Sequence, residues 1–416
     1  MDASATAERL ALDDIRAAEE RIRGLVRQTP LLPAGELSRR VGTRVLLKAE
    51  NLQLTGSFKV RGASNKIALL SDAERAAGVV AASAGNHAQG IAFAARRLGA
   101  KATTVMPVEA ALAKVAAVRQ YGGEIVQVEG GYDEASRAAH ELARRERMTL
   151  VHAFDDPEVV AGQGTVGIEI ATEAPDARLV VIPLGGGGLA TGTAIALKSL
   201  VPGIRVVGVQ AEGCAPYLAS LAAHRPIGAR SANTICDGIA VKEPGELTLP
   251  LVERWIDEVV TVSDDQVAEA MVLLLERSKL VVEGAGAVAV AALMQGKVEV
   301  PSDGAVCAVL SGGNVDASLL AECIRLGETA AGRRVVIFTV VPDRPGALAG
   351  LLRVVADHGA NVVEVTHLRE GMDLHVRETA IQLVLQTNGG EHNSEILAAI
   401  EAEGFEARVE HKDAGR

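Results

Sequence analysis

The sequence predicts an α/β protein with parallel sheets covered by helices, followed by a smaller α+β domain. Three observations lead to this prediction. Nearly half of the residues (48%) are hydrophobic and only 2% are aromatic, a profile that suits helices packed on buried strands. Short apolar runs alternate with helix-length segments through residues 1–328. Beyond residue 334 the order of the elements changes.

Length, charge and cysteine usage limit the class of protein. A chain of 416 residues is too long for one ordinary domain. Its net charge of −11 is mild, and basic residues are scattered among acidic ones, so we expect no nucleic-acid partner. The N-terminal stretch lacks the apolar core of a secretory signal, and no apolar run approaches the roughly 20 residues of a membrane span, so we expect a cytoplasmic protein without membrane contact. The cysteines lack CxxC spacing and are expected to be buried free thiols, at Cys214, Cys236, Cys307 and Cys323.

The first expected element is an amphipathic helix. Leu12, Ile15, Ile22 and Val26 recur at helical spacing, and Pro30 follows. Short apolar runs then predict strands at RVLLKAE (44–50), GVVAAS (78–83), KATTVMP (101–107), GEIVQVE (123–129), RLVVIPLGGGG (178–188), IRVVGVQ (204–210) and GAVCAVLSGG (304–313). A helix-length segment follows most of them, which indicates parallel sheets.

A polar segment of small residues, GETAAGRR (327–334), interrupts this pattern. We therefore expect a linker at 329–334. Residues 335–416 then predict a strand, a helix, two strands, a helix and a last strand. This βαββαβ order is the ferredoxin-like unit.

The stretch TGSFKVRGA (55–63) places Lys59 in the first turn of a predicted helix. The positive end of the helix dipole disfavours a second positive charge and lowers the pKa of the amine. A neutral lysine can bond covalently to a carbonyl carbon, which is the chemistry that pyridoxal phosphate enzymes require of the protein. A single Ser-x-Lys stretch is more often a solvated helix start, so the assignment depends on the other loops.

A second strand-to-helix loop is SAGNHAQG (83–90). Asn86 offers an amide to a ring hydroxyl or a carboxylate. A substrate carboxylate can bind the backbone amides of Ser83 to His87 at the helix N-terminus. An Asn- and Ser-rich turn without function is the simpler interpretation of this loop alone.

Two further loops follow predicted strands. Four consecutive glycines, Gly185 to Gly188, precede a helix and let bare N–H groups surround a phosphate. The loop lacks the GxGxxG spacing and the P-loop lysine, which disfavours dinucleotide and ATP sites. In AVLSGGNVD, Ser311 offers a hydroxyl to a heteroaromatic nitrogen; unlike a carboxylate, a hydroxyl leaves a pyridine unprotonated and so a weaker electron sink.

All four loops lie at the carboxyl ends of predicted strands, where open α/β sheets bind ligands. Together they supply a covalent anchor, a ring contact, a phosphate cradle and a partner for a ring nitrogen. The order of SFKVRGA, SAGNHAQG, GGGGL and SGGN resembles the fold-type II pyridoxal phosphate enzymes, and among them the threonine ammonia-lyase (threonine dehydratase) family, over about residues 10–328.

The resemblance implies a tryptophan synthase β-like catalytic domain at 1–328 with two lobes of parallel sheet, the smaller at about 75–150. The implied cofactor is pyridoxal 5'-phosphate. The resemblance also implies that Lys59 binds the cofactor covalently and acts as the catalytic base. The other implied cofactor-binding residues are Phe58, Asn86, Gly185, Gly186, Gly187, Gly188, Leu189, Glu283 and Ser311. The implied substrate-binding residues are Ser57, Ser83, Ala84, Gly85, Asn86 and His87.

The implied reaction is α,β-elimination from L-threonine to 2-oxobutanoate and ammonia, and more slowly from L-serine to pyruvate. Residues 335–416 resemble an ACT domain through PDRPGAL and ANVVEV, which implies regulation by an amino acid. We expect a homodimer or homotetramer. The resemblance leaves open a role in isoleucine biosynthesis or in threonine breakdown, the identity of the effector, and the preference between threonine and serine.

At two places the sequence differs from related enzymes, and each difference disfavours one property of those enzymes. Racemases of this type carry a hydroxyl in the middle of the Asn-containing loop, where this chain has Ala84, which disfavours serine racemase. Relatives that bind a divalent cation carry acidic ligands just after VVGV, where this chain has Gln210 and Pro216. Since only Glu212 remains, we expect no divalent metal site, while a weaker or monovalent site stays open.

Other functions remain as alternatives. A serine dehydratase or racemase, or a β-replacing enzyme such as cysteine or threonine synthase, would share the fold and cofactor, and sulfide dependence would distinguish the last group. A non-catalytic amino-acid sensor with a degenerate large domain is disfavoured by the intact Lys59, glycine loop and Ser311.

Overall fold

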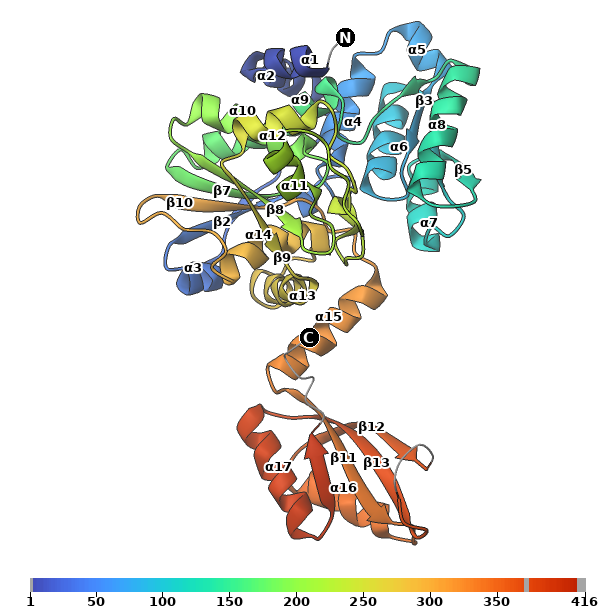
Figure 1. Ribbon diagram of the computed structural model, residues 1–416, viewed down its shortest axis with the longest axis vertical. Helices are drawn as coiled ribbons and strands as arrows, with labels where there is room; N and C mark the ends of the chain where they lie inside the picture. Colours follow the sequence, from blue (N-terminus) through green and yellow to red (C-terminus); the bar gives the residue numbers. More distant parts are fainter. Residues whose placement is uncertain (1–2, 370–373, 410–416) are drawn as a thin grey trace. The chain divides into compact units, whose positions relative to one another are not determined.

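The computed structural model describes residues 3–369 and 374–409 and divides into two compact units, Met1–Asp316 and Ala317–Arg416. The described strands form a six-stranded and a four-stranded sheet in the first unit and another four-stranded sheet in the second (Figure 1). The predicted α/β class is confirmed. All four cysteines are free and buried, as predicted. Within the described ranges, no helix combines the length and apolarity needed to cross a membrane.

The six-stranded sheet has the order β1-β2-β10-β7-β8-β9. All neighbouring strands are parallel except β1 and β2. The strands are β1 Leu31–Pro33, β2 Arg44–Ala49, β7 Ala177–Pro183, β8 Arg205–Ala211, β9 Glu258–Val262 and β10 Ala305–Leu310. The central strand β10 is buried at every position, as expected for a parallel strand covered on both faces.

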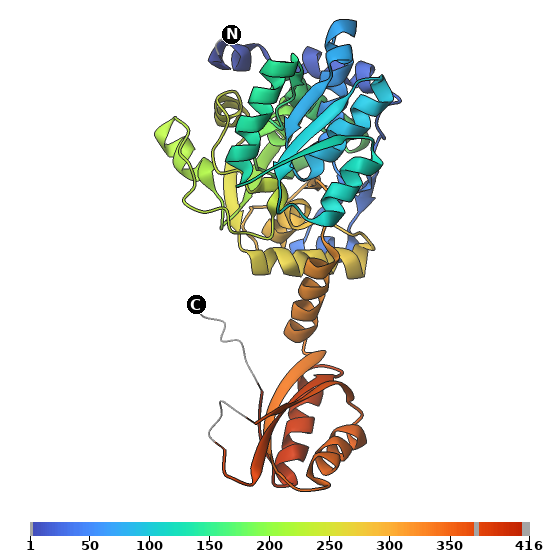
Figure 2. The same cartoon turned by 90° about the vertical axis from the view of Figure 1, so that its right-hand side faces the viewer.

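Helices cover both faces of this sheet (Figures 1 and 2). On one face, α9 (Pro157–Glu173) and α10 (Gly188–Leu200) pack on the sheet, where Ile170 and Leu189 join Ile182 and Val309 in one buried apolar cluster. On the other face, α14 (Gly284–Met294) packs on β7, β8 and β10.

The four-stranded sheet of the first unit is parallel, with the order β5-β4-β3-β6. Its strands are β3 Val79–Ala82, β4 Ala102–Pro107, β5 Glu124–Val128 and β6 Thr149–Leu150. Its helices are α6 Asn86–Leu98, α7 Leu112–Gln120 and α8 Tyr132–Glu146. Helix α4 (Lys59–Ala68) packs on both α6 and α9, and so connects this smaller lobe with the larger one (Figure 1).

The remaining helices of the first unit are α1 Ala3–Arg9, α2 Leu12–Ile22, α3 Gly35–Val41, η1 Glu50–Leu52, α5 Asp72–Ala77, α11 Pro216–Ala223, η2 Asp237–Ile239, α12 Thr248–Trp255, α13 Asp264–Leu273 and η3 Leu274–Ser278. The predicted N-terminal helix forms as α2, with Ile15 and Ile22 buried. It ends before Val26, because Gly24 adopts a φ of +77°, a left-handed conformation that stops helices.

The second unit begins with α15 (Ala317–Ala330), whose last turn includes the first residues of the expected linker. Its other elements are β11 Arg334–Pro342, α16 Ala347–Asp357, β12 Asn361–Leu368, β13 Glu378–Gln386, α17 Gly390–Ala402 and β14 Glu406–Val409. This order confirms the βαββαβ prediction. The sheet is antiparallel, with the order β12-β13-β11-β14, and α16 and α17 cover one of its faces (Figures 1 and 2).

Candidate active site

The loops singled out in the sequence meet where the two lobes of the first unit adjoin. Three of them follow β2, β7 and β10 of the six-stranded sheet, and the fourth follows β3 of the smaller sheet. The loops after β2 and β10 are joined by backbone bonds, since the Phe58 amide donates to the Ser311 carbonyl (3.1 Å) and the Gly313 amide donates to the Gly56 carbonyl (2.8 Å). The glycine loop after β7 lies against Phe154, whose ring leaves no room for a Cβ at Gly186.

Lys59 is the first residue of α4, as predicted. Its Nζ donates to the Ala153 carbonyl oxygen (2.8 Å) and lies 5.1 Å from the centre of the Phe58 ring. Removal from water lowers the pKa of this amine to about 8, although the charge of Glu283 opposes the shift. A fraction of Lys59 is therefore neutral near pH 7 and able to act as a nucleophile or a base.

Asn86, the first residue of α6, is the middle member of a chain of side-chain hydrogen bonds. Asn314 Nδ2 donates to Asn86 Oδ1 (2.7 Å), and Asn86 Nδ2 donates to Glu283 Oε1 (2.7 Å). Glu283 comes directly before α14. Removal from water raises the pKa of this carboxyl group to about 7, while the Asn86 hydrogen bond opposes the shift.

Replacement of Glu283 by Gln is expected to stabilise the cofactor-free protein in a pH-dependent way. The folded-state pKa of about 7 lies above the usual 4.5, so ionisation of Glu283 destabilises the fold increasingly as the pH rises from about 4.5 to 7. Glutamine keeps the acceptor for Asn86 without the charge. The melting temperature of Glu283→Gln should exceed that of the wild type at pH 8 and match it at pH 4.5. An equal difference at both pH values would contradict this explanation.

The glycine loop presents free backbone donors. Among the described residues, the amides of Gly185 to Leu189 donate to no protein acceptor, whereas the next bond of the loop runs from the Thr191 amide to the Gly187 carbonyl. Gly187 has a φ of +94° and directly precedes α10. A run of unpaired N–H groups at a helix N-terminus binds a phosphate or another anion.

The loop after β3 supplies fewer free amides than the sequence suggests. The Ser83 amide donates to the Val105 carbonyl (3.0 Å), and the Gly85 amide donates to Ser83 Oγ (3.2 Å). The His87 ring is buried, with Nε2 bound to the Val151 carbonyl (2.9 Å), and removal from water lowers its pKa to about 3. The backbone amides of Ala84, Asn86 and His87 are without an acceptor in the part of the chain that the structure describes.

Two buried serines lie on either side of this region. Ser57 Oγ has no hydrogen-bond partner among the described residues. Ser311 Oγ donates to the Ala285 carbonyl over a long distance of 3.4 Å, and its oxygen accepts no hydrogen bond from the residues that the structure describes. Ser57 and Gly312 form a backbone bridge, which brings the two serine loops together.

Comparison with known proteins identifies the family to which the first unit is similar. Residues 22–312 match the family model of the pyridoxal-phosphate dependent enzymes. The chain belongs to this family. Residues 335–384 of the same pyridoxal-phosphate dependent enzyme match the ACT domain model.

Individual relatives of this pyridoxal-phosphate dependent enzyme cover most of its length. It is 45% identical over 400 residues to the L-threonine ammonia-lyase of Thermotoga maritima, covering 96% of this chain and 99% of that protein. It is 41% identical over 314 residues to the L-threonine dehydratase catabolic TdcB of Escherichia coli (strain K12), covering 75% and 95%. The solved structure of threonine deaminase isoform 2 from Solanum lycopersicum matches with a TM-score of 0.72 and 36% identity, covering 76% of this chain and 92% of that one.

The residues present fit pyridoxal phosphate, the cofactor of this family. The glycine loop offers unpaired amides to its phosphate, and its close packing admits no Cβ, which would clash with Phe154 at Gly186 and with Tyr217 at Gly187. Ser57 Oγ is a buried polar atom without a partner among the described residues, and Lys59 Nζ is an amine with a lowered pKa. These donors suit an aldehyde that carries a phosphate and a polar ring.

Gln210, near the end of β8, forms an internal link in this pyridoxal-phosphate dependent enzyme. Gln210 is buried; its Nε2 donates to the Leu184 carbonyl (3.2 Å), and its Oε1 accepts from the Tyr217 amide (3.0 Å). Pro216 is the first residue of α11. Over residues 3–369 and 374–409, no three His, Cys, Asp or Glu residues are grouped to hold a metal ion.

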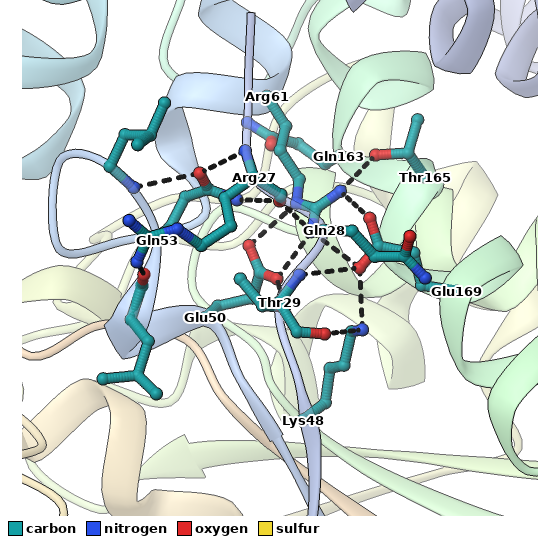
Figure 3. Close-up of polar contacts among 12 residues, drawn as sticks. Arg27, Gln28, Thr29, Lys48, Glu50, Gln53, Arg61, Gln163, Thr165 and Glu169 are labelled. Carbon is teal, nitrogen blue, oxygen red and sulfur yellow. Dashed lines mark hydrogen bonds and ion pairs between the residues drawn. The ribbon is translucent and has the colours of Figure 1, made fainter. Parts of the chain in front are cut away.

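A buried charge cluster surrounds Arg61 (Figure 3), the second residue after Lys59 in the sequence. It consists of Arg61, Glu50, Glu169 and Lys48. The Arg61 guanidinium donates to both carboxylates at 2.6–2.9 Å, and Lys48 Nζ lies 2.7 Å from Glu169. Burial opposes the ionisation of Glu50, but Arg61 holds the pKa of that carboxyl below its usual value. The cluster ties α4 to β2 and α9 and thereby fixes the helix that begins with Lys59.

Sequence reasoning missed three contacts of the site. Ala153 and Phe154, in the segment that follows β6, contact Lys59 and the glycine loop. Asn314 binds Asn86 and the Thr55 carbonyl (2.8 Å). The SGGN stretch contains Asn314 and was a usable signal, whereas a backbone carbonyl such as that of Ala153 has no signature in a sequence.

Proposed function

We propose that this enzyme is an L-threonine ammonia-lyase that converts L-threonine to 2-oxobutanoate and ammonia, and L-serine more slowly to pyruvate and ammonia. The observation that carries the proposal is the Lys59 amine, with a pKa of about 8, at the meeting point of four ligand-binding loops. The relative that is 45% identical over nearly the whole chain supports the choice of substrate.

The catalytic role falls to Lys59. When bound, pyridoxal phosphate supplies an aldehyde for covalent attachment and a ring that withdraws electrons from the substrate α-carbon. Lys59 Nζ would hold the cofactor through its aldehyde and, with substrate bound, would accept the α-proton. Loss of the α-proton and the β-hydroxyl amounts to loss of one water, and one water is taken up when ammonia is released, so the reaction balances.

The remaining site residues bind and orient. Gly185 to Leu189 hold the phosphate, Asn86 contacts the ring hydroxyl, and Phe58 and Glu283 line the ring. Ser57 and the loop from Ser83 to His87 hold the substrate carboxylate. Ser311 would face the ring nitrogen; a hydroxyl there, unlike a carboxylate, would leave that nitrogen unprotonated, which would favour elimination over transamination. Residues 1–328 act as the catalytic domain under this proposal, joined through 329–334 to a regulatory domain at 335–416.

The ACT domain makes the enzyme subject to regulation by an amino acid, for which a branched-chain amino acid is our first candidate. Inhibition by isoleucine would indicate a role in isoleucine biosynthesis, whereas insensitivity would favour threonine breakdown, the role named for the Escherichia coli relative. We further propose a cytoplasmic homodimer or homotetramer.

The proposal is tested by an assay of 2-oxo acid release from L-threonine and L-serine by the purified full-length protein, with and without L-isoleucine. We expect a higher kcat/KM for threonine and a change in activity with isoleucine. No release from either amino acid by a protein that carries pyridoxal phosphate would contradict the reaction. A response to sulfide would instead point to a β-replacing enzyme.

A further inference from the structure

Tyr217, on α11, is a fully buried tyrosine that the proposed reaction does not use. Its hydroxyl lies 3.1 Å from the Gly186 carbonyl oxygen and 3.2 Å from Thr248 Oγ1. Thr248 Oγ1 lies 3.3 Å from Asp155 Oδ1, which also accepts from the Leu247 and Thr248 amides. The glycine loop is therefore supported from inside the protein by a chain of polar groups that starts at a carboxylate.

The available hydroxyl protons fix which of these groups donate hydrogen bonds and which accept them. Tyr217 and Thr248 each carry one hydroxyl proton, and the Gly186 carbonyl can only accept. The Gly186 carbonyl therefore receives the tyrosine proton, while the threonine proton goes to Asp155 or to the tyrosine oxygen. Removal from water raises the pKa of Tyr217 well above its usual value, so the hydroxyl keeps the proton that it donates.

This hydrogen bond sets the direction of a neighbouring N–H group. The Gly186 carbonyl and the Gly187 amide belong to one trans peptide, so they point in opposite directions. Because Tyr217 holds the carbonyl, the Gly187 N–H points away from Tyr217, and it has no acceptor among the described residues. The contact is close, since a Cβ at Gly187 would lie 2.5 Å from the tyrosine oxygen.

The Gln210 side chain links Tyr217 to the residue before the glycine loop. It donates to the carbonyl of Leu184, directly before the glycine loop, and accepts from the amide of Tyr217. We propose that Tyr217, seated by Gln210, is a positioning residue that presets the glycine loop for the phosphate of the cofactor. The inference rests on the proposed phosphate-binding role of the loop and assigns to Tyr217 a function that involves no contact with substrate or cofactor.

The test compares three ligands on the full-length protein freed of cofactor: pyridoxal phosphate, pyridoxal without the phosphate, and inorganic phosphate as a competitor. Tyr217→Phe removes the hydroxyl and keeps the ring. We expect about tenfold weaker binding of pyridoxal phosphate, because the Gly186 carbonyl loses its only donor among the described residues, and weaker competition by phosphate. Binding of pyridoxal should be unchanged.

Thr248→Val is the matched control, because it removes a hydroxyl from the same row of hydrogen-bonded groups and leaves the bond from Tyr217 to the Gly186 carbonyl in place. It should bind pyridoxal phosphate within about twofold of the wild type. Gln210→Glu provides a second variant. It replaces the Nε2 donor by a carboxylate oxygen, which is repelled by the Leu184 carbonyl, and it should show the same phosphate-specific defect. If Tyr217→Phe does not fold, as judged by its melting temperature, Gln210→Glu decides.

Wild-type affinity in the folded variants, or an equal loss for pyridoxal phosphate and pyridoxal, would overturn the inference. A wild-type protein that bound neither compound would instead overturn the cofactor site itself, and the inference with it. The two failures are therefore distinguishable.

Discussion

Replacement of Lys59 by Ala is expected to lower the rate of 2-oxo acid release from L-threonine by at least about a thousandfold. Under the proposed function, the variant loses both the amine that would hold the cofactor and the base that would remove the α-proton. The protein should still bind pyridoxal phosphate through the glycine loop, but without a covalent bond. Activity assays, together with absorbance spectra before and after borohydride reduction, measure the two losses separately.

Lys66→Ala is the matched control for Lys59→Ala, because Lys66 lies on the same helix and its amine pairs with Asp156 (2.8 Å) and Glu158 (3.0 Å), away from the site. It should retain activity. Added methylamine or ethylamine should restore part of the activity of Lys59→Ala if a free amine can act as the base. Substantial activity of Lys59→Ala without added amine would refute the catalytic role of Lys59.

Replacement of Arg61 by Met is expected to destabilise the first unit by about 3–5 kcal/mol, because Glu50 and Glu169 would keep buried charges with Lys48 as their remaining partner in the cluster. Urea unfolding followed by the fluorescence of Trp255 measures this loss. That residue is the single tryptophan of the chain and lies on α12 of the first unit, so its signal reports on this unit alone.

Two other variants test the explanation for Arg61. Arg205→Met removes an exposed ion pair with Glu258 (3.2 Å) and should cost less than about 1 kcal/mol. Arg61→Lys keeps the charge but lacks the planar guanidinium that donates two bonds to each carboxylate, so its stability should lie between those of the wild type and Arg61→Met. Equal stability of Arg61→Met and Arg205→Met would show that the buried charge cluster contributes little.

Strands with long apolar runs were predictable from the sequence, and all of those predicted form. The missed strands have physical reasons. β1 and β6 have three and two residues, too few for a pattern. β9 (Glu258–Val262) is a half-buried edge strand, so its sequence lacks the continuous apolar character of the central strands. The N-terminal helix was predicted too long because Val26 continues the apolar spacing beyond the turn at Gly24.

The features of the candidate site that depend on a short stretch of sequence were predictable. The lysine at a helix start and the glycine loop each carry a backbone signature, and these features were found from the sequence. The direction of the His87 ring was not predictable, since it depends on the Val151 carbonyl, 64 residues away in the chain. The support of the glycine loop by Tyr217 depends in the same way on the packing of α11 against a loop 31 residues earlier.

The polypeptide enters the smaller lobe and leaves it at neighbouring positions. The Thr149 amide donates to the Gly78 carbonyl (3.0 Å), so the chain that departs before β3 returns beside its own starting point at β6. A segment with adjoining ends can be transplanted with little strain on the recipient. Exchange of residues 78–149 between relatives would carry the proposed substrate-carboxylate loop and leave Lys59, the glycine loop and Ser311 in place. Such an exchange would therefore replace the proposed carboxylate loop together with the ring contact of Asn86, while the lysine and the phosphate loop stay those of the recipient.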